Sequence, residues 1–221
     1  MNRFILAVAF LIVSYTAASA SSCSQLYPNN FQYTGNTTEL CNSFYVVQFD
    51  EKNNIPLFSA ELLKPNQPSV TRSNDFHPDV RLNKEVRAEN SDYDATGYDK
   101  GHMTPAEDAS TAQEMHDTFL LSNMTPQSPI LNRQPWRMLE EAVHKQVNAS
   151  SHPIHIVTGA IYSKGEFHSI GFHHIQIPVA YYKIIYLDSG IETYYAVNSN
   201  SAVVQKVTVA DLQQYVPFVI K

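Results

Sequence analysis

The chain has 221 residues, of which 43% are hydrophobic, and its formal net charge is −6 at pH 7. This length and hydrophobic content are enough for one substantial core, so two domains are not needed and we expect a single α+β domain over residues 21–221. The negative charge excludes a polycation that coats nucleic acid non-specifically, so any recognition of phosphate must come from a local group of cations.

Residues 1–20 have the features of a secretory signal peptide. Arg3 precedes an apolar run at 4–13 and a small-residue stretch that ends at Ala20, which predicts cleavage after Ala20. The apolar run is too short to favour a membrane-spanning helix. We therefore expect a secreted or periplasmic protein that has no contact with a membrane once the signal peptide is removed.

The mature sequence retains two cysteines, Cys23 and Cys41. In an oxidising compartment this pair favours one disulfide that holds the N-terminal arm, and two free thiols are the alternative. Both lie far in sequence from the histidine-containing stretch at 98–105, which argues against a catalytic or zinc-binding use.

The first half of the chain predicts strands followed by a long polar segment. Alternating apolar and polar residues at 43–49 and 56–63 predict two antiparallel strands. Residues 64–96 are rich in Asn, Asp and Pro, and the short run at 118–121 is a candidate strand.

The second half begins with the clearest predicted helix, residues 131–147. Its apolar residues recur at helical spacing, and Pro135 is tolerable only in a first turn. Stretches rich in β-forming residues follow at 154–159, 175–187 and 193–197. A closing helix is predicted at 207–216, with Thr208 as its N-cap residue. The order of elements indicates a mixed sheet with a few helices.

The stretch YDKGHMTP at 98–105 contains His102. We expect a hairpin leading into a helix to bring it together with Asn123, Asn132 and Glu140. Histidine has an ordinary pKa near 6.5, so His102 can take a proton from water close to neutral pH. Asn132 and Glu140 are eight positions apart, which leaves them about 80° apart around a helix. They can therefore face one pocket.

Oxygen ligands such as an Asn132 amide suit a hard cation, and Mg²⁺ commonly takes one or two protein ligands together with water and substrate phosphate. Mn²⁺ is the alternative ion. With Glu140 holding the water around the ion, the group fits metal-assisted hydrolysis of a phosphodiester. The alternative from these residues alone is an ordinary helix with a polar face, preceded by a solvated loop.

Three linked motifs, YDKGHMTPAED, FLLSNMTPQ and LNRQPWRMLE, resemble in order and spacing the DNA/RNA non-specific endonucleases, the group that includes secreted bacterial nucleases and endonuclease G. The resemblance is strong over residues 72–162. It implies an α+β fold with a mixed central antiparallel sheet, helices and a ββα-metal finger. It also implies cleavage of DNA and RNA with little sequence preference, leaving 5′-phosphate ends.

The resemblance also implies roles for individual residues. His102 matches the general base, Asn132 the direct metal ligand, Glu140 the acid beside the water around the metal, and Asn123 the residue that braces the loop carrying the histidine. Two further motif positions, which the resemblance indicates are structural, are occupied by Gln127 and Trp136.

The basic residues of the motif region match the family pattern less closely than the residues above. Arg72 lies where the family has an upstream phosphate-binding arginine, and Arg81 or Arg87 could serve instead. Lys100 replaces the usual arginine of the first motif, so a forked guanidinium becomes a point charge. His144 stands where the family often has arginine. Both replacements weaken fixed positive charge at neutral pH.

Other functions remain open from the sequence. The resemblance implies DNA and RNA as partners, but an inactive secreted nucleic-acid-binding protein with the same fold is the alternative. A zinc enzyme built from the later histidines (His152, His155, His168, His173 and His174) has no H-E-x-x-H helix to support it. The sequence leaves the oligomeric state open, a homodimer included.

Overall fold

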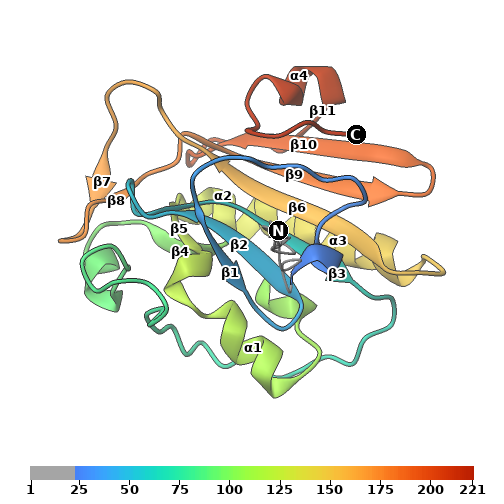
Figure 1. Ribbon diagram of the computed structural model, residues 1–221, viewed down its shortest axis with the longest axis horizontal. Coiled ribbons are helices and arrows are strands. Elements are labelled where there is room, and N and C mark those ends of the chain that lie inside the picture. The colour runs from blue at the N-terminus through green and yellow to red at the C-terminus, as the bar shows by residue number, and fades with distance from the viewer. Residues whose placement is uncertain (1–22) are drawn as a thin grey trace, which may run out of the picture.

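A seven-stranded antiparallel sheet forms the centre of the protein in a computed structural model that describes residues 23–221 (Figure 1). The predicted signal peptide lies outside the described residues. In spatial order the strands are β1 (Thr38–Cys41), β2 (Tyr45–Asp50), β3 (Ile55–Leu63), β6 (Ile154–Ile161), β9 (Ala180–Leu187), β10 (Gly190–Val197) and β11 (Gln205–Val207).

The predicted pair of strands at 43–49 and 56–63 is confirmed. It forms β2 and β3, which run antiparallel with Val46 opposite Ala60. β2 is buried along nearly its whole length, since both faces of the sheet are covered at this point. The short edge strands β1 and β11 were not predicted, because three or four residues carry too little periodicity.

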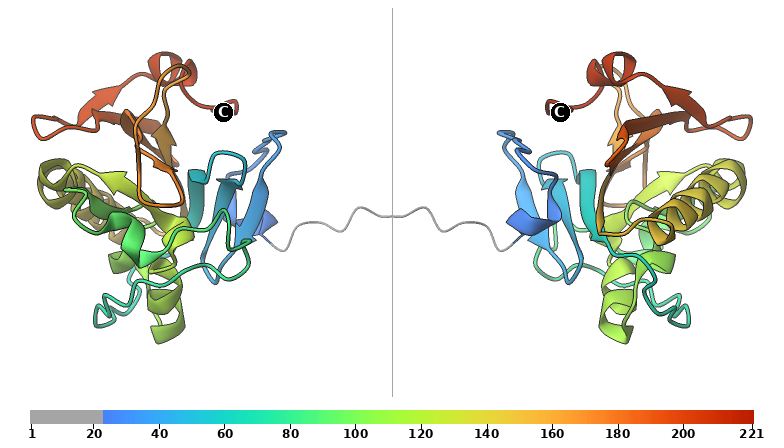
Figure 2. Two further views of the ribbon diagram at one scale, coloured as in Figure 1. Left: turned by 90° about the vertical axis from the view of Figure 1, so that its left-hand side faces the viewer. Right: turned by 90° about the vertical axis from the view of Figure 1, so that its right-hand side faces the viewer.

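Different elements cover the two faces of the sheet. On one face, α3 (Arg137–Asn148) packs its apolar side against β3, β6 and β9. The other face is covered by η1 (Ser24–Leu26), α4 (Val209–Gln213) and the C-terminal residues up to Ile220. The C-terminal elements lie apart from α3, towards the top of both views in Figure 2. The chemistry-bearing motifs all belong to the α3 side.

The first and second motifs form the antiparallel pair β4 (Asp99–His102) and β5 (Met124–Gln127). The chain then enters a nearly continuous helical rod, made of α2 (Pro129–Leu131), a π-helical segment η5 (Asn132–Trp136) and α3. The arrangement is the hairpin followed by a helix that the sequence predicts. It brings β4 and the start of the rod side by side.

The predicted helix at 131–147 is confirmed, but Pro135 does not occupy its first turn. The rod already begins at Pro129, and Pro135 lies inside the π-helical segment. Proline cannot donate a backbone hydrogen bond, and a wider turn accommodates both the missing donor and the ring. The irregular turn also carries Asn132 at its first position.

The candidate strand at 118–121 is wrong. This run follows α1 (Ala112–Thr118) and enters the short helix η4 (Leu121–Asn123), and the strand begins only at Met124. A four-residue apolar run cannot distinguish a helix end from a strand. The start of α1 had a signal in Thr111, whose side chain forms a capping box with Glu114.

The C-terminal third follows the prediction with two differences. The predicted strand at 175–187 is divided into β8 (Ile175–Gln176), which pairs with β7 (Ser169–Ile170), and β9. The closing helix is shorter than predicted, although the Thr208 hydroxyl caps it by accepting from the Asp211 amide at 3.1 Å. Within the described chain, no helix is both long and apolar enough to cross a lipid bilayer.

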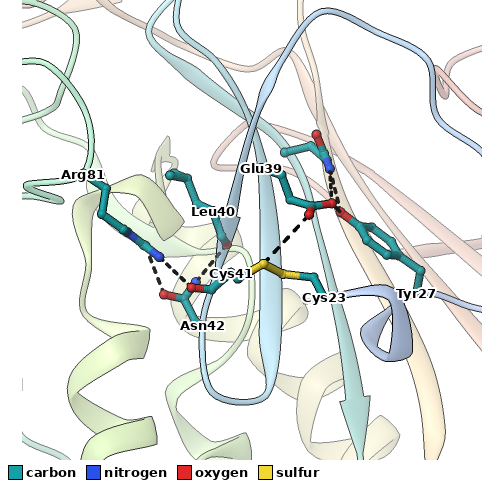
Figure 3. The surroundings of a disulfide bond; sticks show 8 residues. Cys23, Tyr27, Glu39, Leu40, Cys41, Asn42 and Arg81 are labelled. Carbon is teal, nitrogen blue, oxygen red and sulfur yellow. Dashed lines mark hydrogen bonds between the residues drawn. A yellow bond between two sulfur atoms is a disulfide. The ribbon is translucent and has the colours of Figure 1, made fainter. Parts of the chain in front are cut away.

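The predicted disulfide between Cys23 and Cys41 is present, with the two Cα atoms 5.8 Å apart. It joins the N-terminal segment to the edge strand β1 (Figure 3). Tyr27 strengthens the same junction by donating from its hydroxyl to Glu39 at 2.7 Å. The arm is therefore fixed to the sheet by a covalent bond and by a side-chain hydrogen bond.

Candidate active site

A cavity of about 390 Å³ opens between β4, the short helix η3 (Ala106–Asp108) and the helical rod. Five of the six predicted site residues line it, and only Asn123 does not. The full lining consists of Arg72, Lys100, His102, Pro105, Ala106, Glu107, Asn132, Arg133, Arg137 and Glu140. The fold thus assembles residues from the first and third motifs and from the polar segment around one space.

His102 ends β4 and is enclosed by aromatic rings. Its ring lies edge-on to Phe119, with centroids 5.1 Å apart, and 5.9 Å from Phe76. Burial, together with the charge of Arg72, lowers the pKa of His102 to about 3. The imidazole is therefore neutral at pH 7 and can accept a proton. Its buried Nε2 atom has no hydrogen-bond partner among the described residues.

Asn132 is oriented by Asp99. Its amide nitrogen donates to the Asp99 carboxylate at 2.9 Å, and a carboxylate can only accept, so the amide oxygen is the atom left for a ligand. Asp99 also forms a two-pronged ion pair with Arg133, at 2.8 and 2.6 Å. Asp99 therefore ties β4 to the start of the rod.

Glu140 lies two turns further along the rod. Its pKa is raised to about 8, mainly by burial; Lys183 opposes this shift, and the nearby carboxylates Glu107 and Asp108 add to it. The Oε1 atom is buried without a hydrogen-bond partner among the described residues. A bound cation would supply the missing charge partner. The oxygen donors of Asn132 and Glu140 therefore fit a hard divalent ion.

Asn123 lies behind the cavity and is fully buried. Its side-chain nitrogen donates to the carbonyls of Thr104 and Thr118, at 2.9 and 3.0 Å, and its side-chain oxygen accepts from the Thr104 amide at 3.0 Å. The Met103 amide bonds to its carbonyl as well. Asn123 thus holds the backbone that follows His102.

The structure distinguishes the three candidate arginines. Arg72 lines the cavity, where its guanidinium lies 5.0 Å from the Phe119 ring and donates to Asn74 at 2.8 Å. Arg81 instead pairs with Asp79 at the edge of the sheet and contacts the segment after the disulfide (Figure 3). Arg87 pairs with Glu89 at 3.0 Å. Of the three, only Arg72 faces the cavity.

Lys100 extends over two aromatic rings at the cavity wall. Its ammonium lies 5.3 Å from the Phe76 ring centre and 5.2 Å from that of Tyr93. Such contacts hold a cation in place while leaving its charge available to a phosphate. Within residues 23–221, no carboxylate forms an ion pair with Lys100.

Two cavity arginines were missed by sequence reasoning. Arg133 and Arg137 lie one turn apart on the rod, and the Arg137 guanidinium donates to the Arg133 carbonyl at 3.1 Å. Arg137 also forms an ion pair with Glu141. Their sequence spacing could have identified them. They lie four residues apart, directly after Asn132, and this spacing places both side chains on one helix face. Both guanidiniums line the cavity, although each is paired with a carboxylate, Arg133 with Asp99 and Arg137 with Glu141.

The glycine of the first motif has a packing role. Gly101 is in extended β4, so it is not required by a left-handed backbone; a Cβ atom there would clash with the side chain of Gln127 on β5. Gln127 and Trp136 are each 1% exposed and lie in the interior, where the Trp136 ring packs 5.6 Å from that of Tyr181. Both positions are structural in this protein.

His144 donates from Nδ1 to the carboxylate of buried Asp108 at 3.1 Å, and this contact raises the pKa of His144. The other histidines considered for zinc are held at separate places. His152 pairs with Asp188, His173 with Asp92, and His155 contacts the Gln25 carbonyl.

The family model described as DNA/RNA non-specific endonuclease matches residues 22–219. Mitochondrial endonuclease G of Homo sapiens is 30% identical over 158 residues, which cover 66% of this chain and 53% of that protein. A nuclease of Nostoc sp. is 36% identical over 100 residues, covering 44% of this chain and 36% of that protein. The chain thus spans about half the length of the curated endonuclease G relatives it matches.

The fold is also similar to that in a crystal structure of an EndoG/EndoGI complex. The TM-score is 0.78 at 24% identity, with 92% of this chain and 93% of that chain covered. This likeness confirms the α+β fold. Since the family model covers nearly all of the described residues, the chain belongs to the DNA/RNA non-specific endonuclease family.

Proposed function

We propose that residues 21–221 form a secreted endonuclease domain that hydrolyses phosphodiester bonds in DNA and RNA with little sequence specificity and requires a divalent metal ion. The observation that carries the proposal is the convergence of His102, Asn132 and Glu140 on one cavity rimmed by arginines and a lysine. Such a cavity attracts a phosphate backbone locally, although the whole chain is acidic.

His102 is the proposed general base. Its imidazole is neutral at pH 7 and it lines the cavity, so it can take a proton from an attacking water. Burial and the Arg72 charge both hold its pKa down. A substrate phosphate beside Arg72 neutralises the second of these causes, which makes the imidazole a stronger base when substrate is bound.

Asn132 would hold the metal ion through its amide oxygen, and Glu140 would hold water around the ion. When bound, Mg²⁺ supplies stabilisation of the negative charge that develops on the phosphate and on the leaving 3′ oxygen. The orphaned Glu140 oxygen and the amide fixed by Asp99 support this assignment. Mn²⁺ has the same preference for oxygen ligands.

Arg72 and Lys100 are the proposed phosphate-binding cations. Both lie at the cavity and both stack on aromatic rings, which positions their charges without cancelling them. Contacts to phosphate carry no base information, so a site built from them supports cleavage without strong sequence choice. Asn123 positions His102 and does not touch the substrate.

Export from the cytoplasm is part of the proposal. The disulfide supports an oxidising compartment, and it agrees with the signal peptide predicted for residues 1–20. Some relatives are mitochondrial proteins, so the destination has to be measured. Expression of the full chain, with sequencing of the mature N-terminus, tests cleavage after Ala20.

The decisive experiment is digestion of supercoiled plasmid and of a matched RNA by the purified protein, with and without Mg²⁺. We expect internal cleavage of both substrates that depends on the metal and leaves 5′-phosphate ends, measured by end-labelling. Binding without cleavage at any metal concentration would instead identify an inactive nucleic-acid-binding protein.

A further inference from the structure

We propose that Asp75, His77 and His116 form a binding site for a divalent transition-metal ion of the zinc class, separate from the cavity that contains His102. Each of the three side chains offers one ligand atom, and these atoms lie within 4.8 Å of one another. None of the three lines the candidate active site.

The ring of His77 is already oriented as a metal ligand. Its Nδ1 atom lies 2.7 Å from the Asp75 carbonyl oxygen, and a carbonyl can only accept, so Nδ1 carries the proton and Nε2 carries the lone pair. Nε2 is buried and has no hydrogen-bond partner within residues 23–221. Metal-binding histidines commonly donate their other ring N–H to a carbonyl in this way.

His116 supplies the second imidazole from the last turn of α1. Its ring stacks on that of His77, with centroids 4.1 Å apart. The His116 side chain is 52% exposed, so its ring can turn to direct a nitrogen at an ion shared with His77. Asp75 is exposed as well, and its carboxylate adds the negative charge that a dication needs.

The backbone holds the two histidines together. The His77 amide donates to the Phe119 carbonyl at 3.2 Å, and the Leu121 amide donates to the His77 carbonyl at 2.9 Å. The segment carrying His77 is thus fixed to the chain just after α1, which carries His116. Because the ligands come from elements that are already joined, little order has to be created when the ion binds.

The donor set selects a different ion from the one proposed for the active site. Two imidazole nitrogens and one carboxylate suit Zn²⁺ and similar ions, whereas Mg²⁺ prefers oxygen ligands. Three protein ligands leave a fourth position for water, as tetrahedral zinc commonly has in open sites. The protein would therefore bind two chemically distinct metals in two places.

An ion at this site would clamp the wall of the active site. Phe76 is adjacent to His77, and its ring packs 4.8 Å from that of Phe119 and faces His102. Joining His77 to His116 would hold this aromatic wall against α1. Binding to the folded state alone raises stability, so Zn²⁺ is expected to raise the melting temperature.

The test is calorimetric titration of the full chain with Zn²⁺ alone, in the presence of excess Mg²⁺ to occupy the oxygen site. Wild type and the control His168→Gln, which changes an exposed histidine elsewhere, should bind one Zn²⁺ tightly and melt at a higher temperature when it is bound. His116→Gln and Asp75→Asn should each weaken binding about tenfold or more. Both changed residues are exposed, so folding should be preserved.

Absorption by Co²⁺ in the visible range, bound in place of Zn²⁺, provides a second measurement that reports ligand geometry and does not depend on nuclease activity. Loss of this spectrum in His77→Gln would identify the buried imidazole as a ligand. If wild type binds no Zn²⁺ at about 1 mM, or if His116→Gln and Asp75→Asn bind it as tightly as wild type, the residues form a stacked histidine pair only and the proposal is wrong.

Discussion

Buried polar side chains occur both in the cavity around His102 and at the corner formed by Asp79 and Arg81. They are fully hydrogen-bonded at the corner and partly unpaired in the cavity. Asp79 is buried, and its carboxylate accepts hydrogen bonds from the Arg81 guanidinium and from the Ser122 hydroxyl, all between 2.6 and 2.8 Å. In the cavity, His102 and Glu140 each keep a buried atom without a partner in the described chain.

We interpret the paired corner at Asp79 as structural and the unpaired groups of the cavity as functional. Unpaired buried polar atoms are costly, and a ligand in the cavity would supply the partners that His102 and Glu140 lack. The perturbed pKa values of His102 and Glu140 share their largest cause, which is burial of the charged form. Four predictions test this contrast, from the largest expected effect to the smallest.

His102→Ala should reduce cleavage on the order of 10² to 10⁴-fold, since it removes the proposed proton acceptor. The fold should survive, because the imidazole nitrogen has no bond to lose. Turnover of plasmid DNA and circular dichroism measure the two effects, with His168→Ala as the matched exposed control. Retention of more than about a third of wild-type turnover would show that His102 is not the base.

Asn132→Ala should reduce metal-dependent activity, by no more than His102→Ala does, because it removes the only direct protein ligand proposed for the ion. Glu140→Gln keeps Asn132 and should lose roughly 10 to 100-fold, as changes beside a metal ligand do. Activity of wild type should disappear with EDTA and return with Mg²⁺. An EDTA-treated enzyme that remains fully active would rule out the metal-dependent mechanism.

Asp79→Asn should lower the free energy of unfolding by roughly 1–3 kcal/mol at pH 7 and leave the reaction chemistry intact, since it disrupts a satisfied buried group. Burial alone would raise the pKa of Asp79, but hydrogen bonds from Arg81 and Ser122 overcome it and hold the pKa below its usual 3.8. The stability from Asp79 is therefore present above pH 3.8 and lost as the pH falls below it.

The difference between wild type and Asp79→Asn should consequently shrink in acid. Urea unfolding at pH 7 and at about pH 3 measures it, with Asn in place of the exposed Asp188 as a control. A difference that stays constant over this range would mean that the Asp79 charge contributes nothing to stability.

Lys100→Ala should weaken binding of nucleic acid modestly, because one phosphate contact is lost. The slope of the logarithm of the binding constant against the logarithm of the salt concentration should become shallower by about 1. Lys100→Arg should keep or raise activity, since a guanidinium can hold a phosphate by two bonds. Both variants are assayed at low and at physiological salt with saturating Mg²⁺. Equal cleavage by Lys100→Ala and wild type at both salts would make the lysine a solvated loop charge.

The sequence predicted the site where its residues are close along the chain or belong to one helix. Asn132 and Glu140 fall on a helix whose apolar period is clear, and His102 lies in a motif that the resemblance identifies. The Thr208 cap and the disulfide were predictable for the same reason, since capping chemistry and cysteine usage are local signals.

Tertiary structure alone decided which distant residues meet. Arg72, Arg81 and Arg87 share one polar segment, and only the packing of that segment against Phe119 directs Arg72 into the cavity. His77 and His116 come together through backbone bonds between a loop and the end of α1. Contacts of this kind depend on how elements pack, and the periodicity of a sequence describes each element by itself.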